Sequence, residues 1–226
     1  MDSMGHSFGP RQLVLALDHA VSFAREDFLA GPSNAAALTL IDRWPDWPAQ
    51  VMALVGPQGS GKSHLAAIWA EMAGARVLAA KLLSETDLPA AFATGALVVE
   101  DVEPAGLDER ALFHLLNLAR EEDAYVLLTA RAPLAGFPVS LRDLHSRLRA
   151  LPSVALSPAD DVLLRSLIVK LAADRQLAVD EALVNYLANH IERSFAAAHA
   201  AVVRLDEEAM RQHRPVTRAL AAELFR

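Results

Sequence analysis

Five short apolar runs divide the first two thirds of the chain, and each is about as long as one buried β-strand. They are apolar at nearly every position, which is typical of strands in a parallel sheet that is covered on both faces. The runs span residues 51–55, 76–79, 96–99, 124–129 and 153–156. Helical patterns lie between them, the longest at 108–121. The pattern therefore predicts an α/β fold with a parallel five-stranded sheet flanked by helices.

The pattern changes after Pro158. From Asp160 to Arg226 every segment has the period of a helix, and no further strand is predicted. Residues 1–11 have no periodic pattern at all. We therefore expect a flexible N-terminal tail at 1–19, an α/β domain at 20–158 and a small all-helical domain at 159–226.

The composition of the chain limits the class of protein and its cellular location. Hydrophobic residues make up 53% of the 226 positions, which suits a globular protein. No apolar run approaches the ~18 residues of a membrane span, and the N-terminus lacks the pattern of a signal peptide. Cysteine is absent, which excludes disulfides and thiolate metal sites. We expect a cytoplasmic protein with no membrane association.

The net charge bears on contact with DNA. Acidic residues outnumber Lys and Arg by 28 to 21, a formal net charge of −7. DNA-binding domains normally carry a concentrated basic face, because neutralising phosphates supplies much of their affinity. Here the arginines are scattered along the chain, so we expect no direct sequence-specific DNA binding. Any link to DNA would pass through a protein partner.

A phosphate-binding pattern stands between the first predicted strand and the following helix. The sequence from Gly56 to Ser63 is Gly-Pro-Gln-Gly-Ser-Gly-Lys-Ser and matches GxxxxGK[ST]. In such a loop backbone amides turn toward the phosphates, the lysine reaches the terminal phosphates and the hydroxyl holds Mg²⁺. The pattern predicts a bound purine nucleotide, ADP or ATP with Mg²⁺. The expected nucleotide contacts are Pro57, Gln58, Gly59, Ser60, Gly61, Lys62, Ser63 and His64.

Two carboxylates follow the third predicted strand. Glu100 could orient Mg²⁺ together with Ser63, and Asp101 could polarise an attacking water. Acidic pairs after buried strands are common, but parallel sheets bind ligands at the carboxyl ends of their strands. We therefore place Glu100 at the metal and Asp101 among the catalytic groups.

Together with Thr129, Ser146-Arg147-Leu148 and a helical module containing Arg193, these motifs resemble the AAA+ ATPases. More narrowly, the chain is similar to the DnaA-related regulators of the Hda type, and the resemblance covers nearly the whole chain. It implies a P-loop AAA+ base followed by a small all-α lid. It also implies that the segment 23–34, including Leu29, brackets the adenine.

The resemblance also assigns roles to three polar residues. Arg147 would be an arginine finger that reaches the γ-phosphate on a neighbouring subunit. Arg193 would contact the chain's own nucleotide, and Thr129 would be a polar sensor. Each has a plainer alternative: both arginines could be solvated surface residues, and a threonine at the end of a strand has many structural uses.

The N-terminal tail contains a peptide that resembles a clamp-docking motif. Gln12, Leu13, Leu15 and Leu17 match the Q-L-x-L-x-L pattern by which Hda-type proteins bind the sliding clamp, the β subunit of DNA polymerase III. The alternative is a short element packed on the protein's own core. DnaA itself continues into a DNA-binding domain, whereas this chain stops at Arg226. The implied partners are therefore DnaA and the clamp, and a homodimer is possible.

One departure concerns activity. The family usually has Asp where this chain has Glu100, and the longer side chain would place Mg²⁺ differently. We therefore expect weak or no hydrolysis by the protein itself and promotion of hydrolysis by DnaA in trans, which would inhibit replication initiation. The alternatives are an autonomous AAA+ ATPase such as a helicase or clamp loader, a small-molecule kinase, and a non-catalytic scaffold.

The docking peptide can be tested directly. Replacing Gln12 and Leu15 with alanine removes a rim hydrogen bond and an apolar anchor, so clamp binding should be lost. Surface plasmon resonance with immobilised clamp measures this loss. If the double variant keeps its affinity, the peptide has only a structural role.

Overall fold

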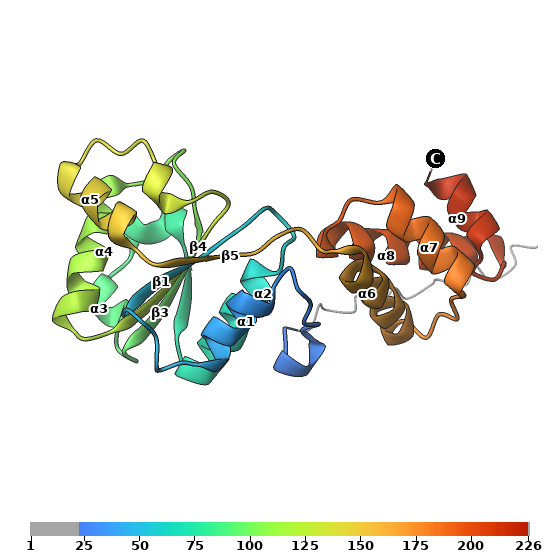
Figure 1. Cartoon of the computed structure of the whole chain (residues 1–226), viewed down its shortest axis with the longest axis horizontal. Helices are drawn as coiled ribbons and strands as arrows, with labels where there is room; N and C mark the ends of the chain where they lie inside the picture. Colours follow the sequence, from blue (N-terminus) through green and yellow to red (C-terminus); the bar gives the residue numbers. More distant parts are fainter. Residues whose placement is uncertain (1–22, 226) are drawn as a thin grey trace, which may run out of the picture.

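The protein's structure, a computed structural model, describes residues 23–225. The docking peptide predicted at Gln12, Leu13, Leu15 and Leu17 lies outside the described residues. In Figure 1 a sheet with helices on both faces stands at one end of the molecule and a group of helices at the other. We call these two parts the base and the lid.

The base contains the predicted parallel sheet of five strands, in the order β2-β3-β4-β1-β5. The strands are β1 (Val51–Val55), β2 (Arg76–Ala79), β3 (Ala96–Val102), β4 (Tyr125–Ala130) and β5 (Ser153–Ala155). The α/β prediction is therefore confirmed. Strand β3 runs further than predicted, and its register with β4 is irregular between Val99 and Val102. The two predicted carboxylates lie inside this irregular stretch.

Alternate residues of each strand enter different cores, which explains why the strands are apolar at nearly every position. In β1, Ala53 and Val55 join one buried cluster, and Met52 and Leu54 join the other. Successive side chains point to opposite faces of a sheet, and here both faces are covered.

Helices cover each face of the sheet in Figure 1. Helices α1 (Ala35–Asp42) and α2 (Lys62–Ala73) lie on one face. On the other lie α3 (Leu88–Ala91), α4 (Glu109–Glu121) and α5 (Arg142–Ala150). Short 3-10 turns occur at η1 (Arg25–Asp27), η2 (Ala80–Glu85) and η3 (Leu134–Gly136).

The lid has a hydrophobic core of its own. Its helices are α6 (Asp161–Asp174), α7 (Glu181–His190), α8 (Phe195–Gln212) and α9 (Arg218–Leu224). Leu164, Ile168, Leu183 and Leu205 are among the side chains buried between them. Within residues 23–225, none of the helices is both long and apolar enough to span a membrane.

Two adjacent leucines in η2 offer a matched test of the base core. Leu83 is 2% exposed and belongs to the cluster on the α4 face, whereas Leu82 is 41% exposed. Leu83→Ala should lower the free energy of unfolding by about 2–5 kcal/mol, because it removes buried methyl groups and leaves a cavity.

Leu82→Ala should stay within about 0.5 kcal/mol, because it changes a surface position. Urea unfolding followed by circular dichroism measures both variants. Equal losses of stability would contradict this packing.

Candidate functional site

The phosphate loop is held tightly between β1 and the rest of the base. A Cβ atom added to Gly56 would lie 2.5 Å from the carbonyl oxygen of Leu156, so no side chain fits there. Gly59 and Gly61 have φ angles of 73° and 99°, a region that favours glycine. The glycines of the motif are therefore required by the path of the backbone.

The lysine of the motif is buried inside the loop that carries it. Lys62 is 7% exposed, and its Nζ donates to the carbonyl oxygens of Gly56 at 2.7 Å and Pro57 at 2.8 Å. Its pKa lies below the usual value because burial disfavours the charged form, and the negative charge of Asp101 opposes this shift. A bound anion would raise the pKa of Lys62, as Asp101 does, and so stabilise its charged form.

The loop leads straight into the N-terminus of α2. Gly61 occupies the N-cap position and provides no side-chain cap, so the positive end of the helix faces the loop. Ser63 is exposed in the first turn, which is where the motif puts the hydroxyl that holds Mg²⁺.

A cavity of about 170 Å³ lies between the loop and the lid. Its polar wall runs from Gly59 to His64, including Lys62. Its apolar wall contains Phe28, Leu29, Leu163, Leu167 and Phe195. A polar, cationic wall facing an apolar one suits a ligand that joins phosphates to a flat base.

Of the other predicted loop contacts, Pro57 and Gln58 are exposed and do not line the cavity, although the Pro57 carbonyl holds Lys62.

The segment before α1 joins the two parts of the molecule. Phe28 packs in the base core and Leu29 against the lid core. Asn34 fixes this turn, since its side chain accepts from the Gly31 amide at 2.9 Å and donates to the Leu29 carbonyl at 3.0 Å. The predicted adenine-bracketing segment therefore forms one side of the cavity.

His64 secures the same segment to the phosphate loop. Its ring makes edge contacts with Phe23 and Phe28, with centroids 5.3 and 5.2 Å apart, and its Nε2 lies 3.0 Å from the Ala24 carbonyl. His64 lines the cavity, so it lies where the sequence prediction puts a nucleotide contact.

The lid touches the phosphate loop itself. The Phe195 amide donates to the Gly59 carbonyl at 3.1 Å, and a Cβ added to Gly59 would lie 2.6 Å from Cβ of Ser194. Helix α8 begins at Phe195, so its N-terminus joins that of α2 at the cavity. Both helix ends carry partial positive charge, which favours an anionic ligand.

Arg193, the predicted contact from the lid, lies just before α8. Its side chain forms an ion pair with Asp161 at 2.7 Å, and both side chains are 54% exposed. Arg193 is not among the residues that line the cavity. Contact between Arg193 and the nucleotide stays a prediction. It would require the ion pair with Asp161 to break, and this pair is weak because it is exposed.

The acidic end of β3 lies beside the loop. Asp101 has a φ of 55°, and its amide donates to Oγ1 of Thr129 at 3.0 Å. Thr129 is fully buried on the neighbouring strand β4 and so holds the backbone of Asp101 in this unusual conformation. Among the nearby carboxylates, Asp101 raises the pKa of Lys62 the most, ahead of Glu100. Thr129 and Asp101, both predicted as site residues, are therefore joined by a hydrogen bond.

The residues present fit a bound nucleotide with Mg²⁺. Oγ of Ser60 and Oε1 of Glu100 are both buried without a hydrogen-bond partner in the structure. Residues 23–225 contain no group of three or more His, Asp or Glu that could hold a metal by themselves. Mg²⁺ at phosphoryl-transfer sites uses few protein ligands, because phosphates and water complete its shell.

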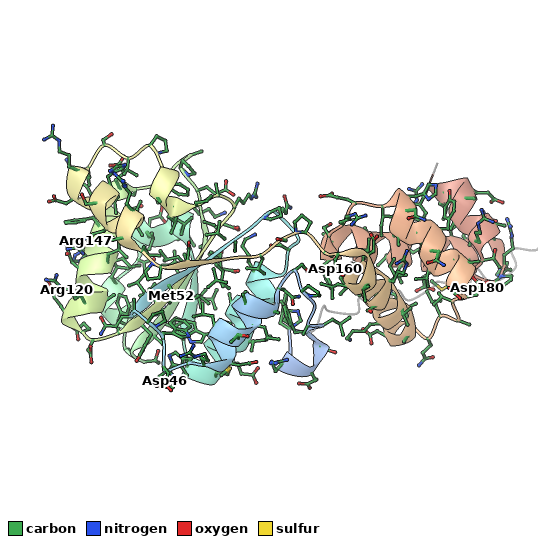
Figure 2. All side chains as sticks on the ribbon, viewed as in Figure 1. Asp46, Met52, Arg120, Arg147, Asp160 and Asp180 are labelled. Carbon is green, nitrogen blue, oxygen red and sulfur yellow. The ribbon has the colours of Figure 1, made fainter. Side chains whose placement is uncertain are left out.

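Arg147 lies far from this cavity. It projects from α5, with its guanidinium carbon 4.8 Å from the ring centroid of Phe113 on α4. It also lines a surface hollow with Gln50 and Arg120, at the amino end of β1. Figure 2 labels Arg147 and Arg120, which lie on α5 and α4. The loop follows the carboxyl end of β1, so the two sites are separated by a strand of five residues, roughly 16 Å.

Most of the apolar wall could not be predicted from the sequence. The predicted segment 23–34 contains Phe28 and Leu29, but the sequence did not predict Leu163, Leu167 or Phe195, which also line the cavity. The last three come from the lid, and nothing in the local sequence separates a cavity-lining leucine from a core leucine. The available signal was the apolar periodicity of 161–174, which marks buried positions without saying what covers them.

No family model and no curated protein matches the sequence. Solved structures do match by shape. Domain III of the replication initiation protein DnaA from Thermotoga maritima has a TM-score of 0.71 at 18% identity, over 89% of this chain and 95% of that one. DnaA from Aquifex aeolicus bound to AMPPCP has a TM-score of 0.67 at 17% identity, over 84% and 69%.

A second kind of AAA+ protein has a similar shape. The RuvB Holliday junction branch migration motor of Thermotoga maritima has a TM-score of 0.68 at 17% identity, over 89% of this chain and 70% of that one. Similarity at this identity establishes the fold and not the activity. The chain has the P-loop AAA+ fold that DnaA and RuvB share.

Proposed function

We propose that the cavity between base and lid binds an adenine nucleotide, ADP or ATP, together with Mg²⁺. The observation that carries this proposal is the meeting of a buried P-loop lysine, two helix N-termini and an apolar wall at one cavity. Lys62 and the loop amides would hold the phosphates, and the apolar wall would hold the base. Ser63 and Glu100 would hold the metal, which supplies charge neutralisation at the phosphates.

The similar DnaA structure from Aquifex aeolicus contains AMPPCP, an observation on that protein which supports a nucleotide here. Either nucleotide would touch both parts of the molecule, because the cavity is lined by the loop and by Phe195 of the lid. Binding would therefore fix the orientation of the lid relative to the base. We propose that ADP is the resident nucleotide and that the bound form is the one that meets a partner.

We propose further that the protein is a negative regulator of replication initiation that stimulates hydrolysis of DnaA-bound ATP. The support comes from the position of Arg147, which lies at the opposite edge of the sheet from the chain's own phosphate loop. An arginine there cannot serve its own nucleotide but is free to serve one on a neighbouring molecule. An arginine supplied in trans stabilises negative charge in the transition state of phosphoryl transfer.

Recruitment would come from the N-terminal peptide. Gln12, Leu13, Leu15 and Leu17 would dock on DNA-loaded sliding clamp and so bring Arg147 close to DnaA near newly replicated DNA. Coupling to the clamp would confine the effect to the time after replication has started. The proposed regulator acts through protein partners, in keeping with its net charge of −7.

An autonomous AAA+ ATPase is the second candidate. The observation in its favour is the similarity to the RuvB motor, whose TM-score of 0.68 is only slightly below the 0.71 of DnaA domain III. The nearness of Asp101 to Lys62 also gives this chain a carboxylate at its own site. This candidate predicts multiple turnover of ATP in the absence of DnaA.

Lys62→Ala tests the nucleotide site. It removes a cation from the loop, and hydrogen bonds to charged groups contribute about 1.5–3 kcal/mol, so affinity for ADP should fall about 10- to 100-fold. Titration of a fluorescent ADP analogue measures this. Lys81→Ala is the control, because Lys81 is exposed on η2 and should leave the affinity unchanged. Equal affinities for both variants would contradict the site.

Arg147→Ala tests the action in trans. The rate at which DnaA hydrolyses labelled ATP is measured in the presence of DNA-loaded clamp. With Arg147→Ala this rate should be about a thousandfold lower than with the unaltered protein, which is the scale of an arginine finger. Affinity for ADP and for the clamp should not change. Arg149→Ala is the matched control, an exposed arginine on the same helix. Full stimulation by Arg147→Ala would rule out the finger role.

A further inference from the structure

Helix α5, which carries Arg147, has no cap from its own side chains. Leu141 occupies its N-cap position and makes no side-chain cap. By contrast, α4, α6, α7, α8 and α9 each begin with an Asp, Ser or Thr that accepts an amide hydrogen bond. The amides at the start of α5 therefore need a partner from elsewhere.

Glu109, the first residue of α4, is that partner for the Leu141 amide at the N-cap position, and it also binds the Ser140 amide just before it. Its carboxylate accepts from the Ser140 amide, at 2.8 Å to Oε1 and 2.9 Å to Oε2, and from the Leu141 amide at 2.8 Å to Oε2. These hydrogen bonds hold the pKa of Glu109 below its usual value, with the Ser140 amide the largest cause. Its negative charge also lies at the positive end of α5.

A second contact joins the same two helices near the middle of α5. The guanidinium group of Arg147 lies over the ring of Phe113, which is one turn beyond Glu109 along α4. Leu144 and Leu148 are buried on α5 and attach it to the base core. The two leucines hold α5 against the base core, and Glu109 holds the backbone at its first turn.

We propose that Glu109 is a positioning residue for Arg147: by capping α5 from a neighbouring helix, it sets the reach of the arginine toward a partner's nucleotide. This proposal rests on the proposed role of Arg147. A helix start that is free to fray would let the arginine sample several positions, and small displacements of a catalytic group lower the rate strongly. Glu109 itself touches no nucleotide.

The test uses the full chain with Glu109→Gln and the control Glu121→Gln, which makes the same change at the exposed last residue of α4. Glutamine keeps the shape of the side chain but loses the charge and presents an amide group to the backbone donors. Hydrogen–deuterium exchange measures how often the backbone amides of residues 138–150 open. Hydrolysis of labelled ATP bound to DnaA measures how strongly each variant stimulates DnaA. Affinity for ADP and the melting temperature are measured alongside.

For Glu109→Gln we expect exchange at Ser140 and Leu141 to rise at least about fivefold, the size expected when a helix loses its cap. Maximal stimulation should fall about fivefold or more, while affinity for ADP stays unchanged. Glu121→Gln should match the unaltered protein in every assay.

Unchanged exchange at 138–150 would overturn the cap, and faster exchange with full stimulation would overturn the positioning role. A loss of stimulation that simply follows a lower melting temperature, and disappears on cooling, would reduce Glu109 to a structural residue. Arg147→Ala separates the two proposals: if it also keeps full stimulation, the proposed function has failed, while the exchange result still decides whether Glu109 caps α5.

Discussion

The burial of Lys62 among the carbonyl oxygens of its own loop is the constraint on which the site depends. An ammonium group is costly to remove from water, and here the oxygens of Gly56 and Pro57 offset that cost. The same loop passes so close to the carbonyl oxygen of Leu156 that Gly56 has no room for a side chain. The loop then leads directly into α2, whose N-cap is Gly61.

The same sheet serves two separate surfaces. Parallel strands bring all their carboxyl ends to one edge, and there the loop, Asp101 and Thr129 meet beside the lid. Their amino ends form the other edge, where α5 presents Arg147 away from the loop. The proposed nucleotide site and the proposed finger therefore lie on separate surfaces, and the contact of Phe195 with Gly59 joins the lid to the first of them.

Much of the base followed from the sequence, because buried parallel strands leave an unambiguous apolar pattern. Strands β1 and β2 begin and end where predicted, since Gly, Pro and charged residues flank short apolar runs. The extra length of β3 was not predictable, because it depends on Thr129 of another strand binding the Asp101 amide. The loop motif gave the polar wall of the cavity, whereas the apolar wall comes from lid residues far along the chain.

We propose that this protein makes DnaA hydrolyse its ATP. The most direct measurement loads purified DnaA with labelled ATP and follows the bound nucleotide with and without this protein and DNA-loaded clamp. We expect conversion to ADP only when the protein and the clamp are both present. Equal hydrolysis of free ATP by this protein without DnaA, or no hydrolysis under any of these conditions, would contradict it.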